Sequence, residues 1–166
     1  ASGHGIATIS NGTTLDVWFP SPALSPLSGS APAELAALVG KDSARAVTRE
    51  LVSIEIDITK APSDAADAYL RLHLLSHRLV KPHGLVLDGI FGILSNVVWT
   101  SVGPCAVDGF EVTRARLKAA HGHVSVYGVD KFPRMVDYVI PSGVRIADAD
   151  RVRLGAHLAS GTTVMH

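Results

Sequence analysis

Short hydrophobic periods along the first 140 residues predict a mixture of strands and helices. Apolar residues flank an Asn-Gly pair at 11–12, a dipeptide that favours a type I′ turn, which predicts a hairpin over residues 5–19. Apolar and polar side chains alternate over residues 51–58, as is typical of a half-buried strand. Apolar, β-branched runs predict two further strands at 97–100 and 124–129.

Two segments carry the longer period of an amphipathic helix. The stronger one begins at Ser63 or Asp64, either of which can cap it, and ends at Pro82 and Gly84. Its predicted apolar stripe consists of Tyr69, Leu72, Leu75 and Leu79. A second helix is expected from about residue 108 to residue 120 and is closed by His121-Gly122.

Residues 20–33 are rich in Pro, Ser, Ala and Gly, a composition that buries little surface and indicates a loop or linker. Because strands and helices are both expected within residues 1–140, this stretch is predicted to form an α+β domain.

Residues 141–166 follow a period of six. An aliphatic residue recurs once in each hexad, and small or short residues fill two further columns in phase with it. The aliphatic column is Ile146, Val152, Leu158 and Val164; the other two are Ala149, Gly155 and Gly161, and Asp150, Ala156 and Thr162. This pattern is typical of a hexapeptide parallel β-helix, in which three hexads form one coil. An ordinary hairpin also fits the alternation over short runs, but alternation does not produce three columns in phase.

A single coil leaves its apolar interior open at one end. Repeat units of this kind need about three or more copies before they are stable alone. We therefore expect either that the natural chain continues beyond His166 or that a partner covers the open face.

Composition narrows the classes of function. The chain has 15 basic and 15 acidic side chains, so no net charge attracts nucleic acid or an anionic membrane. No stretch approaches the length of a membrane span, and no signal peptide begins the sequence. One cysteine, Cys105, excludes an internal disulfide. These features predict a soluble, cytoplasmic protein without nucleic-acid or membrane partners.

Several runs of residues resemble the actinobacterial tetrahydrodipicolinate N-succinyltransferases. The run around Asp130 to Tyr138 is not a general motif of hexapeptide acyltransferases, which makes the match specific. The matching runs are YLRLHLLSHR at 69–78, NVVWT at 96–100, GPCA at 103–106, VYGVDKFPRMVDYV at 126–139 and the repeat at 141–166.

This resemblance implies an N-terminal α/β domain, a left-handed β-helix and a homotrimer with active sites between neighbouring helices. It also implies transfer of succinyl from succinyl-CoA to the amine nitrogen of ring-opened tetrahydrodipicolinate, on the route to diaminopimelate and lysine. In the family, the catalytic glutamate and the CoA-binding residues lie further along the β-helix. Catalytic residues are therefore expected beyond His166, and these 166 residues alone are expected to be inactive.

The resemblance also implies a metal ligand. The resemblance implies a divalent cation on the threefold axis of the trimer, and the aspartate that matches the family's ligand is Asp150. Three symmetry-related carboxylates would repel one another, and a hard cation such as Mg²⁺ or Ca²⁺ would relieve the repulsion. The companion glutamate of the family pattern is absent. Alternatively, Asp150 is a solvated turn residue or pairs with Arg151 or Arg153.

Lys131 and Arg134 are candidate substrate-binding residues, because the acceptor and CoA are both anionic. The alternative is that they pair with Asp130 and Asp137 and serve the structure alone.

Two other groups could have a functional role. His73 and His77 share one helix face and, with His83, could bind zinc, but we favour two histidines on the polar face. Cys105 follows Gly-Pro with no activating base placed by the sequence, which favours a buried, inert thiol.

Two alternatives to the acyltransferase remain open. One is a non-catalytic binding or assembly domain that docks through its short β-helix. The other is a carbonic-anhydrase-like protein, for which His157 and His166 are too few histidines within the repeat.

Overall fold

The computed structural model describes residues 1–166 and begins with a hairpin. Strand β1 (Ser2–Ser10) turns into β2 (Thr13–Trp18) through Asn11 and Gly12, whose φ angles are 49° and 80°. Two consecutive positive φ angles are what a type I′ turn requires, so the predicted turn is confirmed. The hairpin extends three residues closer to the N-terminus than the pattern predicts.

The hairpin forms half of a four-stranded antiparallel sheet with the order β2-β1-β4-β3. The other strands are β3 (Gly40–Asp42) and β4 (Val47–Glu55), and the single turn α1 (Ala33–Ala36) precedes them. Strand β4 begins and ends earlier than predicted, but the alternation holds to Ile58. The half-buried positions are Val52, Ile54, Ile56 and Ile58.

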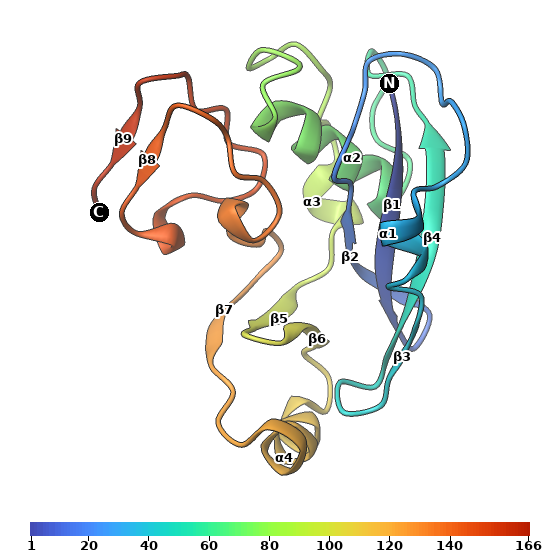
Figure 1. Ribbon diagram of the computed structural model, residues 1–166, viewed down its shortest axis with the longest axis vertical. Helices are drawn as coiled ribbons and strands as arrows, with labels where there is room; N and C mark the ends of the chain where they lie inside the picture. The colour runs from blue at the N-terminus through green and yellow to red at the C-terminus, as the bar shows by residue number, and fades with distance from the viewer.

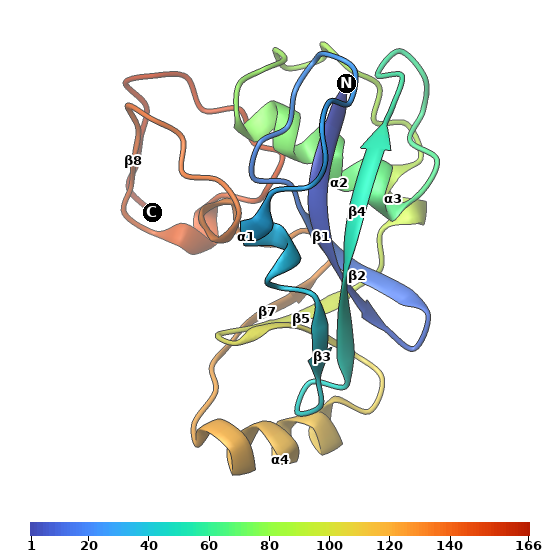
Figure 2. The ribbon, with the colours of Figure 1, turned by 45° about the vertical axis from the view of Figure 1, so that its right-hand side comes forward.

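Helix α2 (Ala65–Ser76) is buried on every side. The carboxylate of Asp64 caps it by accepting the Asp67 N–H at 2.9 Å, as predicted. The predicted amphipathic character is wrong, because every residue from 67 to 76 is buried and Leu79 lies beyond the helix end. Figures 1 and 2 show the reason: β4 and the C-terminal segment lie on opposite sides of α2, so the helix has no face left for water.

A second, three-stranded antiparallel sheet has the order β6-β5-β7. Its strands are β5 (Val97–Thr100), β6 (Gly103–Ala106) and β7 (Val126–Asp130), and the single turn α3 (Ile90–Ile93) precedes them. Helix α4 (Phe110–His121) lies beside this sheet at the lower end of Figure 1. Leu117 and Phe110 of α4 bury a small core with Val98, Cys105 and Val124.

The C-terminal segment makes one circuit, and its end lies beside its beginning. After the turn η1 (Met135–Asp137), strand β8 (Arg145–Ile146) and the turn η2 (Ala149–Arg151) lead round to β9 (Thr163–Val164). Strands β8 and β9 pair in parallel, with residue 145 opposite residue 163, a separation of 18 residues in the sequence. The hairpin alternative required antiparallel pairing and is therefore wrong.

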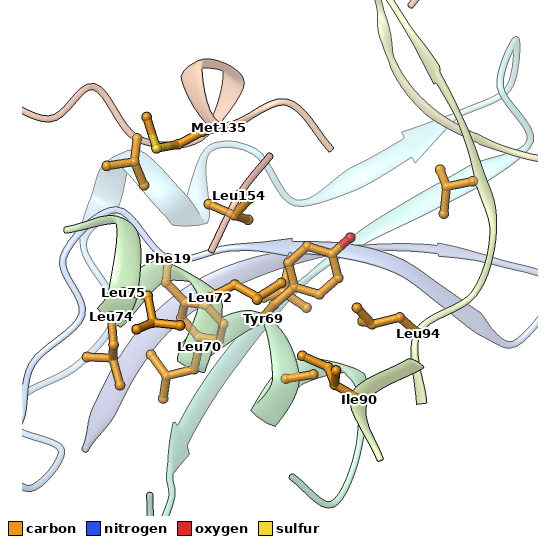
Figure 3. Close-up of a cluster of buried hydrophobic side chains, with 14 of the residues drawn as sticks. Phe19, Tyr69, Leu70, Leu72, Leu74, Leu75, Ile90, Leu94, Met135 and Leu154 are labelled. Atoms are coloured by element: carbon orange, nitrogen blue, oxygen red, sulfur yellow. The ribbon is translucent and has the colours of Figure 1, made fainter. Parts of the chain in front are cut away.

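One large apolar core joins the N-terminal elements to the C-terminal segment. Figure 3 shows Phe19 of the hairpin and Leu72 of α2 in the same cluster as Met135 and Leu154, which come from the C-terminal third of the chain. The fold is thus of mixed α+β class. The predicted division at residue 140 stays a prediction. None of the helices combines the length and apolarity that crossing a bilayer requires.

Candidate ligand sites at the junction

Residues 131–138, called the junction below, follow β7 and connect the two sheets to the C-terminal segment. The junction contains both predicted substrate-binding residues. Lys131 donates its Nζ hydrogens to the backbone carbonyls of Phe91 and Leu94, the latter at 3.0 Å. These carbonyls lie at the end of α3, so the ammonium fixes the junction to that turn. The predicted alternative partner Asp130 instead lies 3.5 Å from Arg153.

Arg134 is held by two carboxylates and one aromatic ring. Its Nε and Nη2 donate to Asp137 at 3.1 and 3.2 Å, and Nη1 donates to Asp150 at 3.4 Å. The guanidinium carbon lies 3.6 Å from the centre of the Tyr127 ring. Burial works against the charged form, but the hydrogen bonds and charge of Asp137 outweigh it and raise the pKa of Arg134. The sequence predicted the pairing with Asp137 and missed Asp150.

Asp150, the predicted metal ligand, lies on η2 with 59% of its side chain exposed. It pairs with Arg134 rather than with Arg151 or Arg153. Arg153 donates to the backbone carbonyl of Asp150, and Arg151 pairs with Asp148. No group of three or more metal-ligating side chains comes together in the chain. One exposed carboxylate fits a hard cation only if further ligands come from outside this chain.

A cavity of about 370 Å³ opens beside Arg134, between β2, the β5–β6 turn and η1. Its most buried charged group is Asp16, which is 6% exposed and accepts a hydrogen bond from the Tyr138 hydroxyl at 2.5 Å. Burial raises the pKa of Asp16, although hydrogen bonds from Tyr138 and Thr8 and the charge of Arg45 oppose the shift. Sequence reasoning missed Asp16; the available signal was one acid between two apolar residues in a predicted strand.

The three histidines weighed as zinc ligands, His73, His77 and His83, do not come together as a site. The polar-face interpretation of His73 is wrong: the ring is fully buried, Nδ1 lies 2.7 Å from the Tyr69 carbonyl, and Nε2 accepts the Phe19 N–H at 3.2 Å. This pattern assigns the proton to Nδ1, so neither nitrogen is free for a metal. Burial lowers the pKa of His73 to about 4. His77 is half-buried, and His83 lines a different cavity with His157.

Cys105 is buried in the small core beneath α4. Burial raises the pKa of its thiol, which keeps the sulfur protonated and a poor nucleophile. This agrees with the interpretation of an inert thiol.

Comparisons with known proteins place this geometry in context. A family model described as "Tetrahydrodipicolinate N-succinyltransferase middle" matches residues 94–134, which span β5 to Arg134. A 2,3,4,5-tetrahydropyridine-2,6-dicarboxylate N-succinyltransferase of Salinispora tropica is 52% identical over 183 aligned positions, covering 100% of this chain. The chain is homologous to the tetrahydrodipicolinate N-succinyltransferases.

Two further succinyltransferases extend the relationship. The Vibrio cholerae enzyme of the same name is 50% identical over 75% of this chain. A Campylobacter jejuni crystal structure, named as a 2,3,4,5-tetrahydropyridine-2-carboxylate N-succinyltransferase, superimposes on 71% of the chain with a TM-score of 0.57 and 35% identity. The chain spans 56% and 36% of the lengths of the Salinispora and Vibrio succinyltransferases, and 30% of the Campylobacter chain.

Proposed function

We propose that this chain is the N-terminal part of an enzyme that moves succinyl from succinyl-CoA to the amine nitrogen of ring-opened tetrahydrodipicolinate. The observation that carries the proposal is the 52% identity with the Salinispora succinyltransferase over the whole chain. In this reaction the amine attacks the thioester carbonyl, an amide bond forms as the C–S bond breaks, and CoA leaves as the thiol with the proton that the amine gives up. The product leads to diaminopimelate and lysine.

The C-terminal segment is proposed to be the first coil of a left-handed parallel β-helix. The parallel pairing of β8 with β9 at a separation of 18 residues supports this, because three hexads make one coil. Gly155 and Gly161 have φ angles of 105° and 92°, conformations that a chain uses to turn corners. All four aliphatic anchors of the repeat pack with the large core.

Helix α2 is proposed to close the first end of this coil, while the other end supports later coils. Leu72 lies directly against Gly155, and an open apolar hollow of about 450 Å³ is lined by Phe132, Leu158 and Val164. Following the family pattern, we place the catalytic glutamate and the CoA site on coils beyond His166.

The decisive experiment combines intact mass spectrometry of the protein from its natural source with a thiol-release assay. We expect a mass near twice 17.4 kDa and release of CoA from succinyl-CoA only when tetrahydrodipicolinate is present. A mass of about 17.4 kDa with no release of CoA would instead support the second candidate, a non-catalytic assembly domain, which the open apolar hollow favours.

Asp150 is proposed to bind Mg²⁺ or Ca²⁺ on the threefold axis of a homotrimer. Its exposure and single ion pair leave the carboxylate able to face two symmetry copies. Metal analysis of purified trimers tests this: Asp150→Asn should lose the bound cation, whereas Asp148→Asn, two residues away, should retain it. Equal metal content in both variants would contradict the proposal.

Lys131 and Arg134 are proposed to contact anionic substrate through N–H groups that the junction does not use. Arg134 has five N–H groups and Asp137 and Asp150 take three of them. In the full-length enzyme, Lys131→Ala or Arg134→Ala should raise KM for the acceptor or for succinyl-CoA. Unchanged KM for both substrates would leave these residues a structural role only.

A further inference from the structure

The cavity beside Arg134 contains a buried acid that no cation neutralises. Asp16 is 6% exposed and forms no ion pair, because the charge of Arg45 reaches it only from a distance. Arg45 itself is committed to Asp42 at 2.7 Å and to the Pro104 carbonyl. A carboxylate buried without a counterion is costly, and a ligand carrying an ammonium group would remove that cost.

Asp16 still has room for such a ligand. Its carboxylate accepts a hydrogen bond from the Tyr138 hydroxyl at 2.5 Å. A carboxylate offers about four acceptor positions, so positions remain for a donor that enters from the cavity.

The same cavity contains a positively charged hydrogen-bond donor, the guanidinium group of Arg134, whose position is fixed by its neighbours. Stacking on Tyr127 and pairing with Asp137 hold the Arg134 guanidinium in place, and two of its N–H groups are used by neither Asp137 nor Asp150. Planar guanidinium groups with free N–H pairs suit carboxylates. Trp18, Tyr127 and Tyr138 supply apolar walls, and the volume of about 370 Å³ falls within the range of small-molecule sites.

We propose that this cavity binds a small zwitterion of the amino-acid class, with its ammonium group at Asp16 and its carboxylate at Arg134. The site lies wholly within residues 16–138 and needs no succinyl-CoA, so it goes beyond the proposed function; a zwitterion bound here would occupy the two Arg134 N–H groups that are also proposed to contact anionic substrate. Because Asp16 belongs to β2 while Arg134 and Tyr138 belong to the junction, the ligand would join the hairpin to the segment that leads into the coil.

The probe is L-norleucine, compared with pentylamine and hexanoate, which each lack one of its two charged groups. Binding is followed through the indole N–H resonance of Trp18 in ¹H–¹⁵N NMR spectra, without succinyl-CoA, so that failure here does not bear on the acyltransferase. We expect saturable binding of norleucine and at least about tenfold weaker binding of both analogues, since each loses a charge-assisted hydrogen bond.

Variants assign the two ends of the ligand. Asp16→Asn keeps the size of the side chain and should weaken norleucine binding by about tenfold or more, while hexanoate binding stays unchanged. Arg134→Gln should weaken norleucine binding by a similar factor, while pentylamine binding stays unchanged. Asp88→Asn, which lines a different cavity, is the control and should bind as the parent does. If Asp16→Asn does not fold, Arg134→Gln alone decides the point. No binding of norleucine at about 10 mM, or equal binding of norleucine and pentylamine, would overturn the proposal.

Discussion

The hydroxyl of Ser76 joins the end of helix α2 to the backbone at Gly155. It accepts the Gly155 N–H at 2.9 Å and donates to the carbonyl of the next residue, Ala156, at 3.0 Å. Arg78 continues the connection by donating to the Leu158 carbonyl at 3.1 Å. A helix end and a turn about 80 residues away in the sequence thus share one partly buried polar network.

Replacing Ser76 by alanine should destabilise the chain by about 1–3 kcal/mol, because the Gly155 N–H and the Ala156 carbonyl lose their buried partner. Urea unfolding followed by circular dichroism measures the change. Ser30→Ala is the matched control, since Ser30 is exposed in the loop before α1, and its unfolding midpoint should not move. Equal midpoints for the two variants would show that Ser76 contributes nothing.

Glycine at position 155 is required by space as well as by backbone angle. A Cβ there would lie 2.7 Å from Leu72 Cδ2, whereas a Cβ at Gly161 meets nothing within 4 Å. Both residues have positive φ, so alanine is strained at either position. Gly155→Ala should therefore cost about 1–3 kcal/mol more than Gly161→Ala in chemical unfolding. A smaller cost at 155 than at 161 would mean that α2 does not pack on this turn.

Arg71 of α2 is buried, and its side chain hydrogen-bonds to two loops. Its side chain is 1% exposed, pairs with Asp67 at 2.6 Å and donates to carbonyls that include Val86 at 2.8 Å and Asp57 at 3.1 Å. Arg71→Met should destabilise by about 3–5 kcal/mol, because Asp67 stays buried without its counterion. Arg114→Met removes an exposed pair with Glu111 and should cost less than about 1 kcal/mol. Thermal unfolding of the two variants compares these losses directly.

Stability should fall as the pH drops below neutrality because of His73. Burial lowers its pKa to about 4 from the ordinary 6.5, so between these values the unfolded chain binds a proton that the folded chain does not. The contribution of His73 is complete above pH 6.5 and decreases as the pH falls towards 4, by about 3 kcal/mol at most. Free energies of unfolding measured from pH 7.5 to 4 check this dependence.

His77 and Asp16 also have shifted pKa values, and their contributions must be separated from that of His73. Burial also lowers the pKa of His77, with the same sign, whereas the raised pKa of Asp16 favours the fold at low pH and acts in the opposite direction. His73→Asn should remove most of the slope, and His121→Gln, at the exposed end of α4, should preserve it. A slope that survives in His73→Asn would assign the effect to another group.

Local signals in the sequence predicted the elements, and long-range packing decided their surroundings. The Asn11-Gly12 turn and the Asp64 cap depend on a few adjacent residues, so the pattern located both. The burial of His73 depends on the Phe19 N–H, 54 residues away, and no local period encodes it.

The candidate site also combines a local contact, which the sequence indicates, with a long-range contact, which it does not. Arg134 and Asp137 lie three residues apart, within the range of local pairing, and the sequence suggested their contact. Asp16 meets Tyr138 across 122 residues, and only the packing of the hairpin against the junction creates that pair. The parallel pairing of β8 with β9 could be predicted from the sequence, because a strict six-residue period indicates a coil whose successive turns lie side by side.

The central position of β1 in its sheet has a consequence for synthesis on the ribosome. Strand β1 can pair with β2 as soon as the hairpin has been made, because only a short turn separates them. The other edge of β1 stays unpaired until β4, which ends at Glu55, has been synthesised. At about 5–20 residues per second, that edge stays unpaired for about two to seven seconds after the hairpin emerges. During this time the nascent chain exposes a strand edge beside Ile6 and Ala7 that can pair with a neighbouring chain, a hazard that ends once β4 is made.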